Sequence, residues 1–471
     1  MKNKLYIAVF GSDEDHCSPK SLEIARKVGE YIAKSGAVLL SGGGSGVMEA
    51  ASQGAYEHGG TVVGILPGAD KQKGNSYCSI TIPTEIGFAR GQVLTNSADS
   101  VIVVEGGIGT AIEARLAYWI QIPILALPKT GGEAEVMADT YFDKRGLIRV
   151  NSAESPEEAV EKAVQLGRNR LDLRQRLQEV GLDLDIYKKV PHKYIRINPR
   201  NPINVGELEK KLKDEYGVET TFSETGVPNV YRSSNSDIGG LISNQRNELF
   251  MKHYFIQDFA SVLAVYVLGL QEGDSYLDLC AAPGFKTILA HDFANGKLDI
   301  TALDVDQKRF ERLQRFLRQD GIEAKLHLAD STIFQGGKYD KVLVDAECSC
   351  EGMIVKYDSD IERDVSGIGS VLKRSSEDVE ELTKLQLQLL QNGFNHLKER
   401  GVLVYATCAM NKYENEEVVR KFLLSNPDAK VEVPDMSQFD VDAKVSDLGV
   451  RVIPGRTRGL YFTRIVRNST N

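Results

Sequence analysis

The segment YLDLCAAPGFKT, residues 276–287, joins a short apolar strand to a turn of small residues and the start of a helix. The residues of that turn are Ala281, Ala282, Pro283 and Gly284. Small residues let the backbone approach a ligand, and the free N–H groups at a helix start can donate hydrogen bonds to it. The segment therefore predicts a ligand-binding edge in an α/β domain, with a tight packing turn as the alternative.

Two further predicted strands follow this turn, and an acid stands at the end of each. DITALDV (299–305) carries Asp304, and AKLHLAD (324–330) carries Asp330. Because ligands bind beyond the carboxyl ends of parallel strands, we expect both acids to lie near Asp278 at one edge of the sheet. Asp304 is placed to accept hydrogen bonds from ribose hydroxyls, and Asp330 suits an adenine amino group. The pattern predicts an adenosine-binding edge.

A cysteine follows the last predicted strand of this half of the chain. The apolar run GVLVYAT (401–407) ends directly before Cys408. Most free cysteines are small apolar fillers. A thiol at the carboxyl end of a buried strand, however, lies where ligands bind in an open α/β sheet.

The C-terminal part resembles the Sun/Fmu family of RNA cytosine-5 methyltransferases, which use S-adenosylmethionine. The resemblance covers roughly residues 186–468. It rests on segments in the family's order: FIQDFAS (255–261), DLCAAPGFKT (278–287), VDAECSCEG (344–352), the helix, strand and Thr-Cys segment at 382–419, and GLYFTRI (459–465).

The resemblance implies a role for each residue of its motifs. Cys408 would add as a thiolate to C6 of cytosine, which makes C5 nucleophilic towards a methyl group. Cys348 would assist release of the product, Asp345 would hydrogen-bond the cytosine edge, and Lys286 would hold the base or its developing charge. The implied cofactor-binding residues are Asp278, Cys280, Ala281, Ala282, Pro283, Gly284, Lys286, Asp304, Arg309, Asp330 and Asp345.

Three positions depart from the family's motifs. Phe285 stands where a second glycine is usual, Glu347 where a proline precedes the release cysteine, and Ala409 where a serine follows Thr-Cys. None of them removes a named catalytic group. They keep open a different function, that of a non-catalytic RNA-binding or assembly factor.

The first half alternates short apolar runs with helical stretches, which is typical of a doubly wound parallel sheet. Its strands are expected at LYIAVFGS, AVLLSGG, TVVGILP, SVIVVEGG and PILALP. Two glycine-rich turns, at 39–52 and 101–119, follow such strands and can cradle a phosphate. With GFARGQVLTNSAD (87–99), they resemble the LOG-type, lysine-decarboxylase-like nucleotide-binding family over about residues 4–165.

This second resemblance implies a nucleotide site made of Gly43, Gly44, Arg90, Gly106, Gly107, Gly109, Thr110 and Glu113. Some members of that family hydrolyse nucleoside 5′-monophosphates with a glutamate and an arginine, here Glu113 and Arg90. Others carry molybdenum cofactor or have no known reaction. Glu105 replaces the proline that is usual in the hydrolases. Because members tend to dimerise, a homodimer through this domain is expected.

Composition limits the class of protein. The chain has 471 residues, 42% hydrophobic and 26% charged, with a net charge of −9, so two or three globular domains are expected. Six scattered cysteines predict no disulfide framework and no paired metal motif. No signal segment or membrane span is evident, which predicts a cytoplasmic protein, with a nuclear location not excluded.

Two stretches concentrate positive charge. Residues 187–200 contain five Lys/Arg and residues 448–471 contain five Arg, and neither contains an acid. Because they bracket one predicted domain, we expect a face that contacts RNA phosphates.

The sequence therefore predicts two Rossmann-like doubly wound α/β domains in series, with a small α+β RNA-binding unit between them. The expected boundaries are 1–167 for the nucleotide-binding domain, 168–185 for a helical linker, 186–250 for the RNA-binding unit and 251–471 for the methyltransferase domain. The expected function is methylation of C5 of cytosine in ribosomal or transfer RNA. A bifunctional protein whose first domain hydrolyses nucleotides is the alternative.

Overall fold

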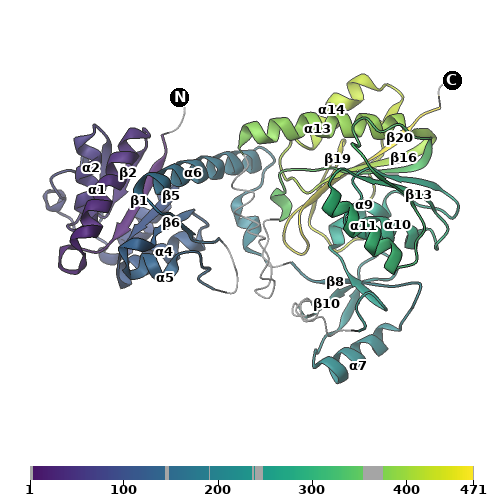
Figure 1. The fold of residues 1–471 in the computed structure, drawn as a ribbon, viewed down its shortest axis with the longest axis horizontal. Helices are drawn as coiled ribbons and strands as arrows, with labels where there is room; N and C mark the ends of the chain where they lie inside the picture. The colour runs from purple at the N-terminus through teal and green to yellow at the C-terminus, as the bar shows by residue number, and fades with distance from the viewer. Residues whose placement is uncertain are drawn as a thin grey trace. The chain divides into compact units, whose positions relative to one another are not determined.

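The computed structural model describes residues 4–143, 148–189, 191–235, 238, 248–353 and 375–469. The described residues up to Gln175 form one compact unit, and those from Arg176 onward, apart from Ser375, form a second. Figure 1 shows the ribbon with its element labels, which are used below. Both units are α/β, which confirms the predicted fold class. Within the described residues, no helix has the length and apolar character needed to cross a membrane.

The N-terminal unit is a parallel sheet in the order β4-β3-β2-β1-β5-β6-β7. Its strands are β1 (Tyr6–Gly11), β2 (Val38–Ser41), β3 (Thr61–Leu66), β4 (Ile80–Pro83), β5 (Ser100–Val104), β6 (Ile124–Leu127) and β7 (Asn151–Ser152). Its helices are α1 (Pro19–Lys34), α2 (Val47–Glu57), α3 (Arg90–Asn96), α4 (Ile108–Trp119) and α5 (Gly132–Met137), followed by α6 (Pro156–Gln178). Helices α1 and α2 pack closely, since a Cβ at Gly29 would lie 1.9 Å from the carbonyl oxygen of Ala51.

The second unit begins with a small antiparallel sheet in the order β11-β8-β10-β9. It consists of β8 (Tyr194–Ile197), β9 (Phe222–Glu224), β10 (Val230–Ser233) and β11 (Tyr254–Ile256), with helix α7 (Val205–Tyr216). The Asn204 side chain caps α7 by accepting from the N–H of Gly206, and Gly217 ends it with a φ of 70°. The predicted α+β segment therefore forms the elements expected of it.

The larger sheet of this unit has the order β14-β13-β12-β15-β16-β20-β19-β18, with β17 paired to β20. Its strands from β14 to β16 are parallel, and β20 runs antiparallel to β16. The bounds are β12 (Ser275–Asp278), β13 (Asp299–Asp304), β14 (Lys325–Leu328), β15 (Tyr339–Asp345), β16 (Leu397–Thr407), β17 (Ala429–Val431), β18 (Ala443–Ser446), β19 (Gly449–Val452) and β20 (Leu460–Arg467).

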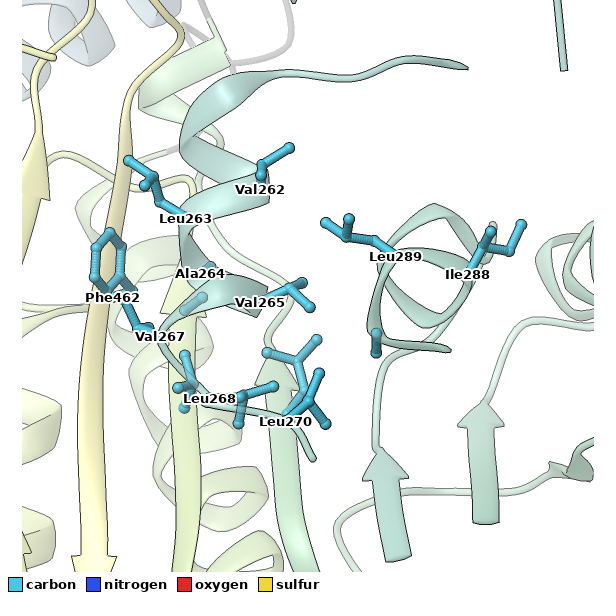
Figure 2. Close-up of a cluster of buried hydrophobic side chains, with 14 of the residues drawn as sticks. Val262, Leu263, Ala264, Val265, Val267, Leu268, Leu270, Ile288, Leu289 and Phe462 are labelled. Atoms are coloured by element: carbon cyan, nitrogen blue, oxygen red, sulfur yellow. The ribbon is translucent and has the colours of Figure 1, made fainter. Parts of the chain in front are cut away.

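Helices cover both faces of this sheet. One face packs against α9 (Phe259–Tyr266), α10 (Phe285–Phe293) and α11 (Gln307–Gln319). The other packs against α13 (Ser376–Asn395) and α14 (Glu416–Ser425). Figure 2 shows part of the first layer, with Leu263 of α9 beside Phe462 of β20. Because alternate strand residues point to opposite faces, Tyr276 lies in this layer and Leu277 in the other.

The predicted linker, 168–185, begins inside α6, which continues to Gln178 as one helix. The apolar positions of that helix stay buried past residue 167, among them Leu173 and Leu177. The domain boundaries at 167, 185 and 250 stay predictions.

Candidate active site

A cavity of about 340 Å³ opens beyond the carboxyl ends of the parallel strands in the second unit. Residues that follow β12, β13, β14, β15 and β16 all line it, because parallel strands deliver their ends to one edge. The predicted site residues that line this cavity are Cys280, Lys286, Asp304, Arg309, Asp330, Asp345, Cys348 and Cys408.

Two thiols meet in this cavity. Cys348 follows β15 and Cys408 follows β16, and these two strands are parallel neighbours. The two Sγ atoms lie 3.0 Å apart, although 60 positions separate the residues in the chain. Cys348 is buried, whereas Cys408 is only partly so. Cys408 is therefore the more accessible of the two to a molecule in the cavity.

The contact with Cys350 and burial keep both thiols protonated. The contacts with Cys350 and Cys408, together with burial, raise the pKa of Cys348 well above the usual thiol range. The contact with Cys348 lowers the pKa of Cys408, but the contact with Cys350 and burial outweigh it, so that this pKa is also raised. A thiolate at Cys408 therefore needs its proton removed as a reaction proceeds.

A charged pair stands beside the thiols. Lys286, in the first turn of α10, places its Nζ 2.5 Å from Oδ2 of Asp345, the last residue of β15. Burial lowers the pKa of Lys286, but the neighbouring carboxylate outweighs it and the net shift is upward. The ammonium therefore stays charged in the cavity, where it can face a polar ring edge together with the carboxylate.

The strand-end acid Asp304 fastens the small-residue turn. Its Oδ2 accepts a hydrogen bond from the N–H of Ala282 at 3.1 Å, and Arg309 donates to the carbonyl oxygen of Ala282 at 2.8 Å. Asp330 is exposed, and its Oδ1 accepts from the N–H of Thr332 at 2.8 Å. Asp304 thus shapes the cavity wall in addition to lining it.

Other residues predicted to bind a cofactor do not line the cavity: Asp278, Ala281, Ala282, Pro283 and Gly284. Asp278 is buried under α10, where it accepts hydrogen bonds from Thr287 Oγ1 at 2.8 Å and Tyr276 OH at 3.2 Å. Burial raises its pKa to about 6. Asp278 therefore supports the turn from beneath, because its side chain points to the α10 face of the sheet.

Two buried glutamates that the sequence reasoning did not identify hold the thiol-bearing loops. Oε2 of Glu351 accepts from the N–H groups of Met410 and Asn411 at 3.0 and 2.9 Å, and its Oε1 accepts from Arg176 at 2.9 Å. Oε1 of Glu414 accepts from the N–H of Ser349 at 2.9 Å. The loop after β15 is thereby tied to the loop after β16. Both glutamates lie in segments that carry the family resemblance, at 344–352 and 382–419, but the resemblance implied no role for them.

Asp258 was also missed, although it lies in the quoted segment FIQDFAS. It caps α9 by accepting from the N–H of Ala260 at 3.1 Å. It also accepts from Thr457 Oγ1 at 2.9 Å and from the N–H of Arg458 at 3.0 Å. Asp258 and Arg458 both line the cavity, so this carboxylate positions an arginine at its wall.

Several positive charges of the two basic stretches are paired with acids, which the sequence did not indicate. Arg196 is 2% exposed and pairs with Asp292, with its guanidinium 4.3 Å from the ring centre of Phe255. In the second stretch, Arg451, Arg456, Arg464 and Arg467 each pair with an acid. The paired acids belong to other segments of the chain. Counting charges within one stretch of sequence therefore does not reveal these pairs.

The two stretches nevertheless adjoin each other. The N–H of His192 donates to the carbonyl oxygen of Arg456 at 2.8 Å, and Lys189 lies beside Gly455. Lys189 is exposed. The segment 187–200 therefore leaves Lys189 as a charge open to solvent next to the second stretch.

In the N-terminal unit the structure brings Arg90 to Glu113, with Nη1 3.3 Å from Oε1. Burial raises the pKa of Glu113, although Arg90 opposes the shift. The arginine packs against Gly42, where a Cβ would lie 2.4 Å from Nη1. Gly42, which was not predicted, must therefore stay a glycine if Arg90 keeps this place.

The two predicted glycine-rich turns follow β2 and β5. Gly43 and Gly106 have φ values of 71° and 103°, a left-handed conformation that favours glycine. Gly107 precedes α4, and Thr110 is buried in its first turn. The adjoining Glu105 accepts from the N–H of Ser18 at 3.0 Å, so its carboxylate faces the start of α1.

Two family models match separate parts of the chain. Residues 4–160 match the SLOG cluster4 family, and residues 265–466 match 16S rRNA methyltransferase RsmB/F. These matches confirm that the N-terminal part resembles LOG-type proteins and that the C-terminal part resembles RNA methyltransferases.

Individual proteins resemble the C-terminal part. Ribosomal RNA small subunit methyltransferase B of Shewanella oneidensis is 31% identical over 218 residues, which is 45% of this chain and 47% of that protein. The 5-cytosine rRNA methyltransferase NSUN4 of Mus musculus is 29% identical over 269 residues, 54% of this chain and 68% of that protein. The chain thus spans about half the length of the bacterial relatives that it matches.

The crystal structure of PH0851 has a similar fold. The matched region is 94% of this chain and 88% of the PH0851 chain, with a TM-score of 0.54 and 20% sequence identity. At this identity the likeness shows the fold alone.

Proposed function

We propose that the second unit methylates C5 of cytosine in RNA, with S-adenosylmethionine as the methyl donor. The observation that carries the proposal is the pair of thiols, Cys348 and Cys408, 3.0 Å apart in a cavity that also holds the Lys286–Asp345 pair. A methyl transfer to an oxygen or nitrogen acceptor has no use for two thiols. The relatives' names, which specify ribosomal RNA, make ribosomal RNA the first substrate to test.

The cavity fits an adenosine-based cofactor. Asp304 ends β13 and Asp330 follows the neighbouring strand β14, and both line the cavity with Arg309. Carboxylates at strand ends accept hydrogen bonds from ribose hydroxyls and an adenine amino group. S-adenosylmethionine, when bound, supplies the methyl group.

The exposure and charge of each residue in the cavity suggest its role in the reaction with cytosine. Cys408, the more accessible thiol, loses its proton to solvent as its sulfur bonds to C6, and the addition raises the electron density at C5. Lys286 and Asp345 hold the polar edge of the base and stabilise the charge that develops on the ring. Cys348 lies beside the C6-bound sulfur and assists its release when the C5 proton has been removed.

The direct test uses the full chain, labelled S-adenosylmethionine, and two RNA preparations, small-subunit ribosomal RNA and transfer RNA. The expected result is labelled 5-methylcytosine, identified by mass spectrometry of the digested RNA. Absence of the product with both RNAs, while S-adenosylmethionine still binds, would instead support the non-catalytic RNA-binding or assembly factor.

RNA is expected to contact the adjoining basic stretches. Reversing Lys189 to Glu should weaken RNA binding about threefold at moderate salt and reduce its salt dependence, because one phosphate contact is lost. Binding of S-adenosylmethionine should not change. The matched control is Lys421→Glu, at an exposed lysine of α14. An unchanged affinity for RNA in Lys189→Glu would remove this segment from the RNA-binding face.

A second activity is favoured by the buried pair in the N-terminal unit. A carboxyl group whose pKa is raised, 3.3 Å from an arginine and among glycine-rich turns, suits cleavage of a nucleoside 5′-monophosphate. The expected result is release of free base by the full chain and its loss in Glu113→Gln. If both proteins leave every nucleotide intact, this unit is a binding domain. Homodimerisation through it and a cytoplasmic location stay predictions.

A further inference from the structure

A third thiol, that of Cys350, stands next to the pair, and the proposed methyl transfer does not use it. The Sγ atoms of Cys348, Cys350 and Cys408 all lie within 4.8 Å of one another. Cys350 donates to the carbonyl oxygen of Cys348 at 3.4 Å. The sequence did not reveal this cluster, because its spacing, Cys-x-Cys with a distant third cysteine, matches no paired metal motif.

The backbone at Cys350 has an unusual conformation. Its φ is 60°, in the left-handed region that costs a residue with a side chain about 1–2 kcal/mol. A glycine would fit this position without that cost. The chain therefore holds a strained cysteine where its sulfur joins the other two.

We propose that Cys348, Cys350 and Cys408 form a three-thiolate site for a soft divalent cation of the zinc class, and that its occupation blocks methyl transfer. Zinc–sulfur bonds of about 2.3 Å place the sulfur atoms about 3.8–4.0 Å apart. The pair at 3.0 Å would have to open by about 1 Å, and the other two distances, which are at most 4.8 Å, differ from the required value by no more than about 1 Å if they are the longer. Rotation of the three thiols suffices for such shifts.

The surroundings suit a site of this kind. Three thiolates and a divalent cation carry one net negative charge, and Lys286, although paired with Asp345, places an ammonium group in the same cavity. All three cysteines also line the cavity, which leaves the fourth coordination position open to water. Binding replaces three S–H protons, which pass to solvent, and no electron is transferred.

Occupation would block the proposed reaction because the same sulfur lone pairs are needed for both. Cys408 cannot add to C6 while it ligates a cation, and Cys348 cannot assist release. Only this second half of the inference depends on the proposed function. The cation site itself stands on the geometry of the three thiols.

The test measures cation binding first, with metal-free full chain kept reduced by a phosphine. Zn²⁺ is titrated in competition with a chromophoric chelator, and Cd²⁺ is titrated while thiolate-to-metal absorption is recorded. The variant is Cys350→Gly, which suits the left-handed backbone and keeps the other two thiols. Cys17→Ser, at a cysteine outside the cluster, is the matched control.

The parent and Cys17→Ser should bind one Zn²⁺ equally, and Cys350→Gly should bind it at least about tenfold more weakly. Each protein's own activity without metal serves as its reference; Zn²⁺ should abolish the parent's methylation of RNA until a chelator is added, whereas Cys350→Gly should keep most of its own metal-free activity. Equal affinity in Cys350→Gly, or no bound metal in the parent, would overturn the site. A block that a reductant reverses but a chelator does not would indicate a Cys348–Cys408 disulfide and also overturn it. A chain that binds Zn²⁺ but never methylates RNA would support the site and count against the proposed function.

Discussion

Cys408→Ala is expected to lower methyl transfer at least about a thousandfold, because C5 of cytosine is not nucleophilic until a thiolate has added to C6. Cys348→Ala is expected to act differently, since the first bond still forms and only its breakage is impaired. That variant should accumulate a protein–RNA adduct that survives denaturing electrophoresis. The pair of outcomes follows from the arrangement of the two sulfurs, with Cys408 partly buried and Cys348 buried beside it.

The measurement combines label transfer to RNA with electrophoresis of each variant after incubation with RNA and S-adenosylmethionine. Cys78→Ala, at a thiol of the N-terminal unit, is the control and should match the parent. An adduct in Cys408→Ala and none in Cys348→Ala would show that the two roles are exchanged. Full activity in Cys408→Ala would show that the thiol is not the nucleophile.

Glu351→Leu is expected to lower the free energy of unfolding of the second unit by about 3–5 kcal/mol. Glu351 is fully buried and pairs with Arg176, which is 4% exposed. Its removal leaves a buried guanidinium uncompensated and deprives the N–H groups of Met410 and Asn411 of their acceptor. The loop that carries Cys408 should therefore loosen with the fold.

Urea unfolding of the full chain, followed by circular dichroism, measures this effect. Glu351→Gln keeps the volume and part of the hydrogen bonding, so its loss should be smaller. Glu347→Gln, at an exposed acid four residues earlier, should change stability by no more than about 0.5 kcal/mol. If Glu351→Leu unfolds at the parent's urea concentration, the buried pair does not anchor this loop.

Local pattern accounts for much of the fold. All five strands expected in the first half are present as β1, β2, β3, β5 and β6, because buried parallel strands are continuous apolar runs. The edge strand β4 (Ile80–Pro83) was not predicted. It has four residues, and Thr81 separates its two isoleucines, so its sequence lacks a continuous apolar run.

The place of three candidate site residues at the edge of the sheet could be predicted from sequence for a related reason, whereas the catalytic roles of Cys408 and Asp345 were implied by the resemblance alone. Cys408, Asp304 and Asp345 each stand at or just after a strand end, and parallel topology gathers strand ends at one edge whatever their order. Asp278 shows where this reasoning stops. It too ends a strand, but it lies beneath the turn, since the face to which a strand's last side chain points depends on register with its neighbours.

The sequence by itself thus determined the two α/β units and the small α+β segment that lies between their large sheets in chain order. It also determined the sheet edge at which the reaction is expected. Only the tertiary structure decided which charges are free and which thiols meet. Arg196 is buried against Asp292, Arg176 against Glu351, and Cys350 lies beside Cys408. The physical reason is range: strands and turns depend on neighbouring residues, whereas ion pairs and thiol clusters depend on contacts between distant segments, which a pattern along the chain does not specify.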